Sequence, residues 1–267
     1  MKGPSGVFTS VAPYYARYRV EYPKELFADA VTFFRLDGTG RILDLGCGTG
    51  ELSIPLAGHV KELVGVDVEK EMLDEAAHRA NEVGIENCTW ACMRAEDIDE
   101  TLGAFRLVTL GRSLHWMEQA TVLKQAYDLL ERGGGLLVAR PVSVPLQDGW
   151  TRDENEWKEI QREVVRRYLG PKRRAGDSLY TEPSVKVEGV FRALSFRRCD
   201  TWTYRYSRTW TLEEAVKNTY SHSFAAPRLF GERMADFENE LREMLRNVQP
   251  SGEFVEHVVL QAHIALK

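Results

Sequence analysis

Short apolar runs alternate with amphipathic stretches along the first half of the chain. Residues 41–45, 63–66, 88–93, 107–110 and 136–139 predict strands, and their continuous apolar character is typical of strands buried on both faces. Residues 23–35, 50–58, 69–82 and 118–131 carry helical spacing, with Pro23 at the first turn and Pro55 limiting the second stretch. Strands and helices that alternate in this way predict a doubly wound α/β fold with a mostly parallel sheet.

The pattern changes after Pro141. One helix is predicted at 153–169, an antiparallel strand at 194–204, helical structure over 211–248 and a last strand at 253–266. We therefore expect residues 1–140 to form a ligand-binding core with an N-terminal cap. Residues 141–267 are expected to add a helical lid and the last strands of a seven-stranded sheet, within the same domain.

Composition and charge narrow the class of protein. The 267 residues are 43% hydrophobic and 28% charged, which is ordinary globular composition. The net charge of −5 gives no general attraction to nucleic acid or to a membrane, and the basic run at 171–174 is expected to be a solvated face. The N-terminus has no apolar signal core, and no apolar run is long enough to span a bilayer.

The cysteines and histidines do not predict a metal site. Cys47, Cys88, Cys92 and Cys199 are scattered without paired metal spacing, so reduced thiols and a cytoplasmic protein are expected. His257 and His263 share one face of the last predicted strand, but they have no carboxylate or cysteine partner there.

A glycine-rich turn follows the first predicted strand. Gly46 and Gly48 would let the backbone approach a ligand closely, because glycine has no Cβ and tolerates positive φ. Asp44 and Glu51 place negative charge where the pyrophosphate of a dinucleotide would dock, which disfavours NAD. Asp67, at the end of the second strand, is placed to accept the ribose hydroxyls. This charge pattern fits S-adenosylmethionine, which carries an ammonium and a sulfonium but no phosphate.

These residues resemble a known family. The stretch 42–50 is similar to motif I of class I S-adenosylmethionine-dependent methyltransferases, and the resemblance extends over roughly residues 14 to 140. The segments 64–67, 94–98 and 113–117 resemble the family's ribose strand end, its adenine-binding turn and the "HW" segment of a bacterial small-molecule subgroup. The resemblance implies a Rossmann-like fold and S-adenosylmethionine as the cofactor.

The resemblance also implies roles for individual residues. Asp44 would hold the methionine ammonium through backbone or water, and Asp67 would bind the ribose. Arg94 stands where the family often has Asp, so which acid reads the adenine amino group stays open. Tyr18 and Arg19 belong to a segment that closes over the cofactor, or they only dock the first helix. The full expected set is Tyr18, Arg19, Asp44, Gly46, Cys47, Gly48, Asp67, Val68, Met72, Ala95, Glu96, Asp97, Ser113 and His115.

Methyl transfer from a sulfonium is an in-line displacement that needs a base only when the nucleophile carries a proton. His115, after the fourth strand, and His222, in a break of the late helical region, are the candidate catalytic residues. Alternatively, His115 packs beside the methionine moiety and His222 lies on the surface. The aromatic residues of the second half either line an apolar acceptor pocket or pack in the core. They are Trp150, Trp157, Trp202, Tyr204, Tyr206 and Trp210.

The expected function is methyl transfer from S-adenosylmethionine to the O, N or C atom of a small molecule, under a lid. An S-adenosylmethionine-binding cyclase or isomerase, or a protein that binds without methylating, is the alternative from another class. A methyltransferase of RNA or protein is disfavoured by the net charge of −5. The expected partner is the small acceptor, and a homodimer is left open.

Overall fold

The computed structural model describes residues 6–142, 144–145, 151–152, 155–176, 178–180 and 187–267, which form a seven-stranded sheet with helices. The strand order is β10-β11-β5-β4-β1-β2-β3. The five strands from β5 to β3 are parallel, β11 runs antiparallel to β5, and β10 runs antiparallel to β11, which confirms the predicted Rossmann-like sheet. The strands are β1 Arg41–Leu45, β2 Glu62–Asp67, β3 Cys88–Cys92, β4 Phe105–Gly111, β5 Leu130–Pro141, β10 Arg198–Thr211 and β11 Glu253–Leu266.

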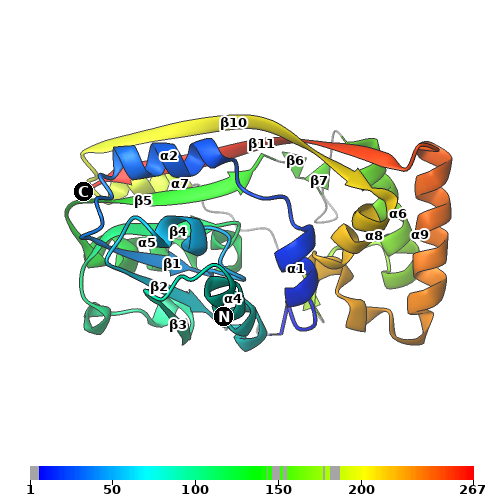
Figure 1. Cartoon of the computed structure of the whole chain (residues 1–267), viewed down its shortest axis with the longest axis horizontal. Coiled ribbons are helices and arrows are strands. Elements are labelled where there is room, and N and C mark those ends of the chain that lie inside the picture. Colours follow the sequence, from blue (N-terminus) through cyan, green and yellow to red (C-terminus); the bar gives the residue numbers. More distant parts are fainter. Residues whose placement is uncertain (1–5, 143, 146–150, 153–154, 177, 181–186) are drawn as a thin grey trace.

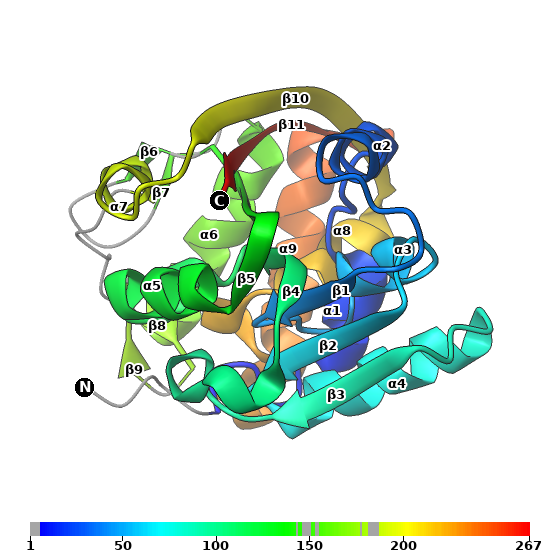
Figure 2. The same ribbon diagram turned by 90° about the vertical axis from the view of Figure 1, so that its left-hand side faces the viewer.

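Helices cover both faces of the sheet (Figure 2). One face carries α2 (Lys24–Phe33), α3 (Ser53–Ala57) and α4 (Lys70–Glu82), and the other carries α5 (Gln119–Leu129) and α7 (Val187–Ala193). Successive residues of β1 point to opposite faces, so Ile42 packs with Leu26 of α2 and Leu43 belongs to the cluster that includes Val122 of α5. Burial on both faces explains why these strands are apolar throughout.

A second layer of helices lies beyond the sheet. β10 and β11 pair from Arg198–Leu266 to Thr211–Glu253, but β5 pairs only with residues 260–266 of β11. The rest of this two-stranded ribbon projects past β5 and carries α6 (Glu156–Leu169), α8 (Leu212–Tyr220) and α9 (Met234–Val248), which we call the lid (Figure 1). Trp157, Trp210 and Phe237 form its apolar core with Phe254 of the ribbon.

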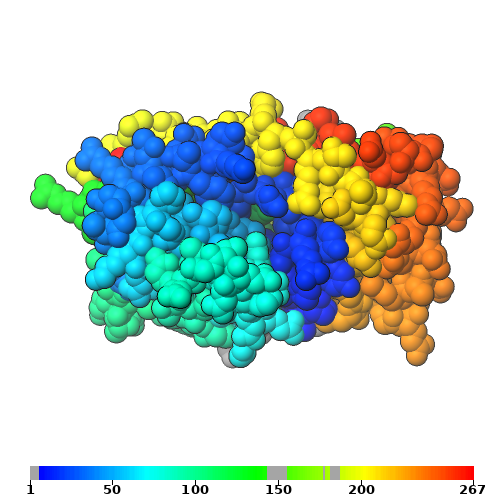
Figure 3. Space-filling view, viewed as in Figure 1, coloured from blue at the N-terminus to red at the C-terminus, as the bar shows by residue number. Residues whose placement is uncertain are grey.

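The N-terminal helix α1 (Ala12–Tyr18) lies between the core and the lid. Figure 3 shows it wedged between α4, in cyan, and the yellow and orange lid helices. Tyr14 makes an edge-to-face contact with Tyr220 of α8, with ring centroids 5.3 Å apart. The backbone carbonyl of Tyr18 accepts a hydrogen bond from Asn218 Nδ2 at 2.5 Å. The two halves of the molecule are therefore joined by α1 as well as by the ribbon.

The late elements differ from the predicted ones in their bounds. The helical region expected at 211–248 is two helices, α8 and α9, separated by short 3₁₀ turns over 223–233, where Pro227 and Gly231 interrupt helical hydrogen bonding. The strand expected at 194–204 begins at Arg198 and continues to Thr211, whose side chain makes a capping box with Glu214 of α8. Two short strand pairs also occur, β6 (Val144–Pro145) with β7 (Thr151–Arg152) and β8 (Arg174–Ala175) with β9 (Ser178–Leu179). In the part of the chain that the structure describes, no helix combines the length and the apolar character needed to cross a membrane.

Candidate donor-binding site

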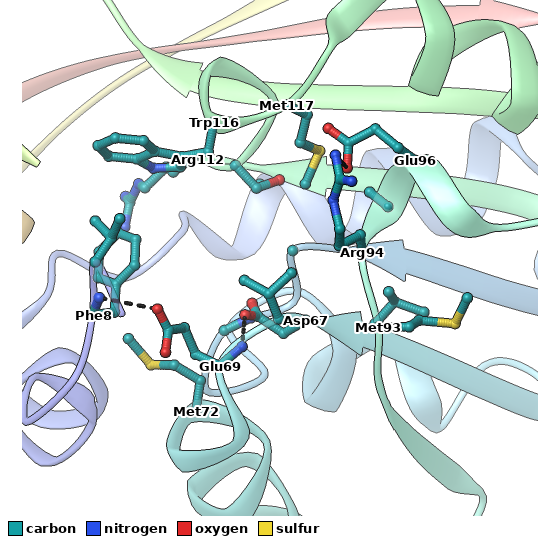
Figure 4. Close-up of a pocket in the computed structure, with 18 of the residues that line it drawn as sticks. Phe8, Asp67, Glu69, Met72, Met93, Arg94, Glu96, Arg112, Trp116 and Met117 are labelled. Atoms are coloured by element: carbon teal, nitrogen blue, oxygen red, sulfur yellow. Dashed lines mark hydrogen bonds and ion pairs between the residues drawn. The ribbon is translucent and has the colours of Figure 1, made fainter. Parts of the chain in front are cut away.

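A cavity of about 780 Å³, open solvent at its mouth included, lies at the carboxyl ends of β1, β2, β3 and β4 (Figure 4). This is the edge at which doubly wound sheets bind their ligands. The cavity is lined by Val7, Phe8, Tyr15, Gly46, Gly48, Val66, Asp67, Val68, Glu69, Met72, Met93, Arg94, Ala95, Glu96, Gly111, Arg112, Ser113, Trp116 and Met117.

The glycine loop presents bare backbone to this cavity. Gly46 and Gly48 line it with φ of +65° and +56°, in the left-handed region that favours glycine. A Cβ on Gly46 would lie 2.5 Å from the Ser113 Cβ and 2.8 Å from the Met117 Cε. The loop therefore lies so close to the segment after β4 that a side chain at residue 46 would not fit.

Asp67 and Glu69 place two carboxylates on the cavity wall. Asp67 Oδ2 accepts a hydrogen bond from the Gly48 N–H at 2.9 Å, and Oδ1 accepts one from the Glu69 N–H at 3.0 Å. These bonds fix the side chain, and each oxygen keeps a further lone pair for a ligand hydroxyl. Burial raises the pKa of Asp67 above its usual value, against the opposing effect of these hydrogen bonds.

The far end of the cavity combines apolar surface with one ion pair. Met93 and Ala95 line it together with Glu96, whose Oε2 lies 3.3 Å from an Nη of Arg94. Glu96 Oε1 also accepts the Glu118 N–H at 2.9 Å, so the carboxylate is held from two sides. An apolar slot bordered by such an acid can take a flat heteroaromatic ring that has an amino group.

Asp44 and Glu51, the two acids expected to face the ligand, lie behind the loop. Asp44 is buried, shares the α2 face of β1 with Ile42, and accepts a hydrogen bond from the Ser53 hydroxyl at 2.5 Å. Glu51 pairs with Arg79 at 2.7 Å. Neither lines the cavity, so the acids that face a ligand are Asp67, Glu69 and Glu96. Carboxylates therefore do line the cavity, but they are not the two from which a negatively charged site was expected.

The remaining expected cofactor residues divide clearly. Val68, Met72, Ala95, Glu96 and Ser113 line the cavity along with Gly46, Gly48 and Asp67. Cys47 is buried under the loop, with its thiol towards Gly65, and burial raises its pKa. Asp97 is exposed outside the cavity. Tyr18 packs against the lid core, and Arg19 lies behind Tyr15, with its guanidinium 5.4 Å from the Tyr15 ring centroid.

His115 and His222 do not line this cavity but belong to one cluster beside it. The His115 ring lies 6.3 Å from the Tyr180 ring, and the Arg173 guanidinium lies 4.1 Å from the same ring. Arg173 also lies 5.6 Å from the Phe224 ring, which is 4.9 Å from His222. Residues 107 positions apart in the chain are thus brought together, and we call these five residues the acceptor-side cluster.

Both imidazoles of this cluster are neutral. Burial, reinforced by Arg173 and Arg19, lowers the pKa of His115 to about 3. Burial and the charge of Arg19 likewise lower the pKa of His222 well below its usual value. The His222 Nδ1 lies 2.9 Å from the Asn218 carbonyl, so it donates there and the lone pair is on Nε2.

The basic run and the tryptophans lie in surroundings that the sequence did not fully predict. Arg173, in the basic run expected to be solvated, is half-buried in the acceptor-side cluster. Trp157 and Trp210 are buried in the lid core, and Trp202 packs on Phe33 of α2. Trp150 lies outside the described residues.

Sequence reasoning missed several cavity residues. Phe8 covers the cavity from the N-terminal segment, where its N–H points to Glu69 Oε1 at 3.4 Å and its ring makes an edge-to-face contact with Trp116. Glu69 could have been noticed, since it follows Asp67 by two residues. Arg112 directly precedes the expected Ser113, but no spacing rule indicated that its side chain enters the site.

Comparisons with known proteins agree with this geometry. Residues 42–134 match the family model described as a methyltransferase domain. An uncharacterised methyltransferase-like protein of Schizosaccharomyces pombe is 28% identical over 92% of this chain and 89% of its own length. The ubiquinone/menaquinone biosynthesis C-methyltransferase UbiE of Rhizobium meliloti is 33% identical over 40% of this chain and 45% of its own. The crystal structure of YcgJ from Bacillus subtilis superposes with a TM-score of 0.56, at 17% identity, over 92% of this chain and 99% of that one.

The fold, the glycine loop and the acid at the end of β2 define a class I S-adenosylmethionine-dependent methyltransferase. Residues 42–134 carry the methyltransferase domain, and the methyl donor is S-adenosylmethionine. The residues present fit that donor, because the bare loop backbone and the three lining carboxylates suit a cationic nucleoside without phosphate.

Proposed function

We propose that this methyltransferase acts on a small molecule, at an O, N or C atom, in the space between the donor cavity and the lid. One observation carries the proposal. Trp116 lines the donor cavity and also makes an edge-to-face contact with Tyr180, at 5.5 Å between ring centroids. The acceptor-side cluster therefore begins where the donor cavity ends.

The cofactor supplies an activated methyl group when it is bound, and the chain's own residues bind and orient the reactants. We propose that Asp67 holds the ribose, that Gly46 and Gly48 pass along the methionine moiety, and that Ala95 and Glu96 border the adenine. His222 would accept a proton from the acceptor at Nε2. Burial lowers the pKa of both imidazoles, so His222 would act as a base only towards an acidic acceptor, and His115 would orient the acceptor through a hydrogen bond.

We also propose that residues 1–140 and 141–267 work as one domain, in which the second part encloses the acceptor. A small acceptor is supported by the relative named for ubiquinone/menaquinone biosynthesis. An RNA or protein acceptor would need an open basic face. In the described part of the chain, Arg167, which precedes the basic run 171–174, pairs instead with Glu163 and Glu240.

Label transfer tests the proposal. The protein is incubated with methyl-labelled S-adenosylmethionine and, in separate reactions, a metabolite extract below about 1 kDa, total RNA and total protein. We expect label in the metabolites and release of S-adenosylhomocysteine. Label in RNA or protein would overturn the small-molecule acceptor. Donor binding without any labelled product would favour the cyclase, isomerase or binding-protein alternative.

The catalytic roles have their own test once an acceptor is known. If His222 is the base, the substitution H222A should lower kcat about 10²- to 10⁴-fold and leave donor affinity unchanged. H115A should act mainly on the KM of the acceptor. H78A is the matched control, because His78 is exposed on α4 and pairs only loosely with Glu82. Equal effects of H222A and H78A would remove His222 from the mechanism.

A further inference from the structure

The donor's amino-acid end carries a carboxylate, which needs a cationic partner in the cavity. The glycine loop and the lining acids suit the ammonium, the sulfonium and the ribose, but they would repel a carboxylate. Among the described residues that line the cavity, Arg94 and Arg112 are the two with a cationic side chain. The candidate partner of the carboxylate is therefore one of these two arginines.

Arg94 lies at the wrong end of the cavity for this task. It follows β3, beside Ala95, and its guanidinium pairs with Glu96 at 3.3 Å. This end borders the proposed adenine position. Figure 4 shows Arg94 directed towards Glu96 and Met117, whereas Arg112 lies on the other side, near Trp116 and Phe8.

Arg112 lies beside the glycine loop. It directly precedes Ser113, whose hydroxyl donates to the Leu45 carbonyl at 2.7 Å, next to Gly46. The Arg112 Nη1 donates to the Val20 carbonyl at 2.6 Å, and the guanidinium lies 4.4 Å from the Tyr22 ring centroid. Its Nε is buried and has no hydrogen-bond partner among the described residues. A charged donor is thus held in place with part of its hydrogen-bonding capacity unused.

The backbone of Arg112 is strained in a way that serves this placement. Its φ of +57° lies in the left-handed region, which costs a residue with a Cβ about 1 kcal/mol. The conformation is held by the Arg112 N–H, which donates to the Ala139 carbonyl of β5 at 2.8 Å. Strained residues of this kind cluster at ligand sites, where the surrounding structure fixes them.

A second cation nearby makes an anion still more favourable. Arg19, on the segment that follows α1, lies behind Tyr15, and its pKa is lowered by burial and by the charge of Arg112. Two half-buried guanidinium groups repel each other. A carboxylate bound in the cavity beside them would offset this repulsion and so be bound more favourably.

We propose that Arg112 binds the methionine carboxylate of S-adenosylmethionine and so fixes the position of the donor's amino-acid end. The proposal rests on the donor and not on the small-molecule acceptor. Its test therefore uses binding alone, and it can succeed or fail independently of the acceptor's identity.

Calorimetry with two matched ligands tests Arg112. S-Adenosylhomocysteine has the carboxylate, and its decarboxylated analogue keeps the adenosine, the sulfur and the amine. The substitution R112Q should weaken S-adenosylhomocysteine about 10- to 100-fold, the usual size of a charge-assisted hydrogen bond, and change the analogue less than about threefold. R112K, which keeps the charge, should show a smaller selective loss. R94Q is the control, since it should weaken both ligands by the same factor.

Two results would overturn the proposal. If R112Q and R112K, checked for unaltered circular dichroism, weaken both ligands equally, Arg112 only pins the N-terminal segment through Val20. If R19Q shows the selective loss and R112Q does not, Arg19 holds the carboxylate. The wild-type protein supplies a further check, because it should prefer S-adenosylhomocysteine to the decarboxylated analogue.

Discussion

At the scale of single residues, the donor loop depends on the absence of side chains. The backbone of Gly46 has positive φ, and the space where a Cβ would lie is filled by Ser113 and Met117. The loop can therefore lie against the segment after β4 only if residue 46 is glycine.

The substitution G46A should weaken S-adenosylhomocysteine at least about tenfold and lower the free energy of unfolding by about 1–3 kcal/mol, because the loop must move away from Ser113. Calorimetry and urea unfolding measure the two effects. G38A is the control: Gly38 also has positive φ, +88°, but nothing lies within 4 Å of its Cβ position. Equal destabilisation of the two variants, with donor affinity kept in G46A, would contradict the steric argument.

Asp44 predicts a pH dependence of stability. Burial raises its pKa from 3.8 to about 6, against the hydrogen bond from Ser53. An acid whose pKa is raised by folding stabilises the protein while it is protonated, and this contribution is lost as pH rises through about 6. D44N should remove that loss, so its free energy of unfolding should gain about 1–3 kcal/mol relative to wild type between pH 4 and pH 7. Urea unfolding across this range measures the difference, and parallel curves would exclude a raised pKa.

At the scale of elements, the core strands were predictable from sequence and the lid was less so. The run 41–45 coincides with β1, because a strand buried on both faces is apolar throughout. The helix α7 was missed, and the break expected near His222 extends further than predicted, to α9 at Met234, because these ends are set by packing against the sheet and the ribbon rather than by local propensity. Elements with a strong period were found, and short ones stabilised by tertiary contacts were not.

The same reasoning explains the outcome for the site. Gly46, Gly48 and Asp67 lie at strand ends, so topology alone brings them to one edge. Asp44 shares its face with Ile42, and the two-residue period of a strand could have indicated that it points under the loop. Arg112 could not have been found this way, because its position depends on Val20, which is 92 residues away in the chain.

The lid predicts a contrast between a buried and an exposed ion pair. Lys158 lies 3.2 Å from Glu256, with the two side chains only 6% and 14% exposed, whereas Lys70 and Asp74 are 75% and 64% exposed. K158M should lower the free energy of unfolding by about 3 kcal/mol, because it leaves the largely buried Glu256 carboxylate without its cationic partner. The carboxylate would keep only the neutral hydrogen bond from the Trp210 indole among the contacts named here.

The exposed pair on α4 is the control for that variant. K70M should change the free energy of unfolding by less than about 0.5 kcal/mol, since solvent screens the pair. Chemical unfolding of both variants measures the contrast. A K158M protein as stable as K70M would show that Glu256 is adequately solvated in the folded state.

At the scale of the whole molecule, core and lid share one continuous pair of strands. Donor binding at the core should therefore stabilise the lid as well. S-Adenosylhomocysteine at about 100 times its Kd should add about 2.7 kcal/mol and raise the Tm by roughly 5 °C, in one transition seen alike by far-UV and near-UV circular dichroism. NAD at the same concentration should not shift the Tm. Two separate transitions, of which only one moves, would show that the lid unfolds on its own.

The far end of the β10–β11 ribbon has a consequence for how such enzymes diversify. Thr211 and Glu253 face each other as a strand pair, so the 212–252 segment leaves and returns at one point. Residues 212–252, which form most of the lid, are thus a cassette: a segment whose two ends lie side by side. This cassette contacts the core mainly along α1. If the lid encloses the acceptor as proposed, exchange of this cassette at Thr211 and Glu253 would change the acceptor and keep the donor cavity, in evolution or in engineering.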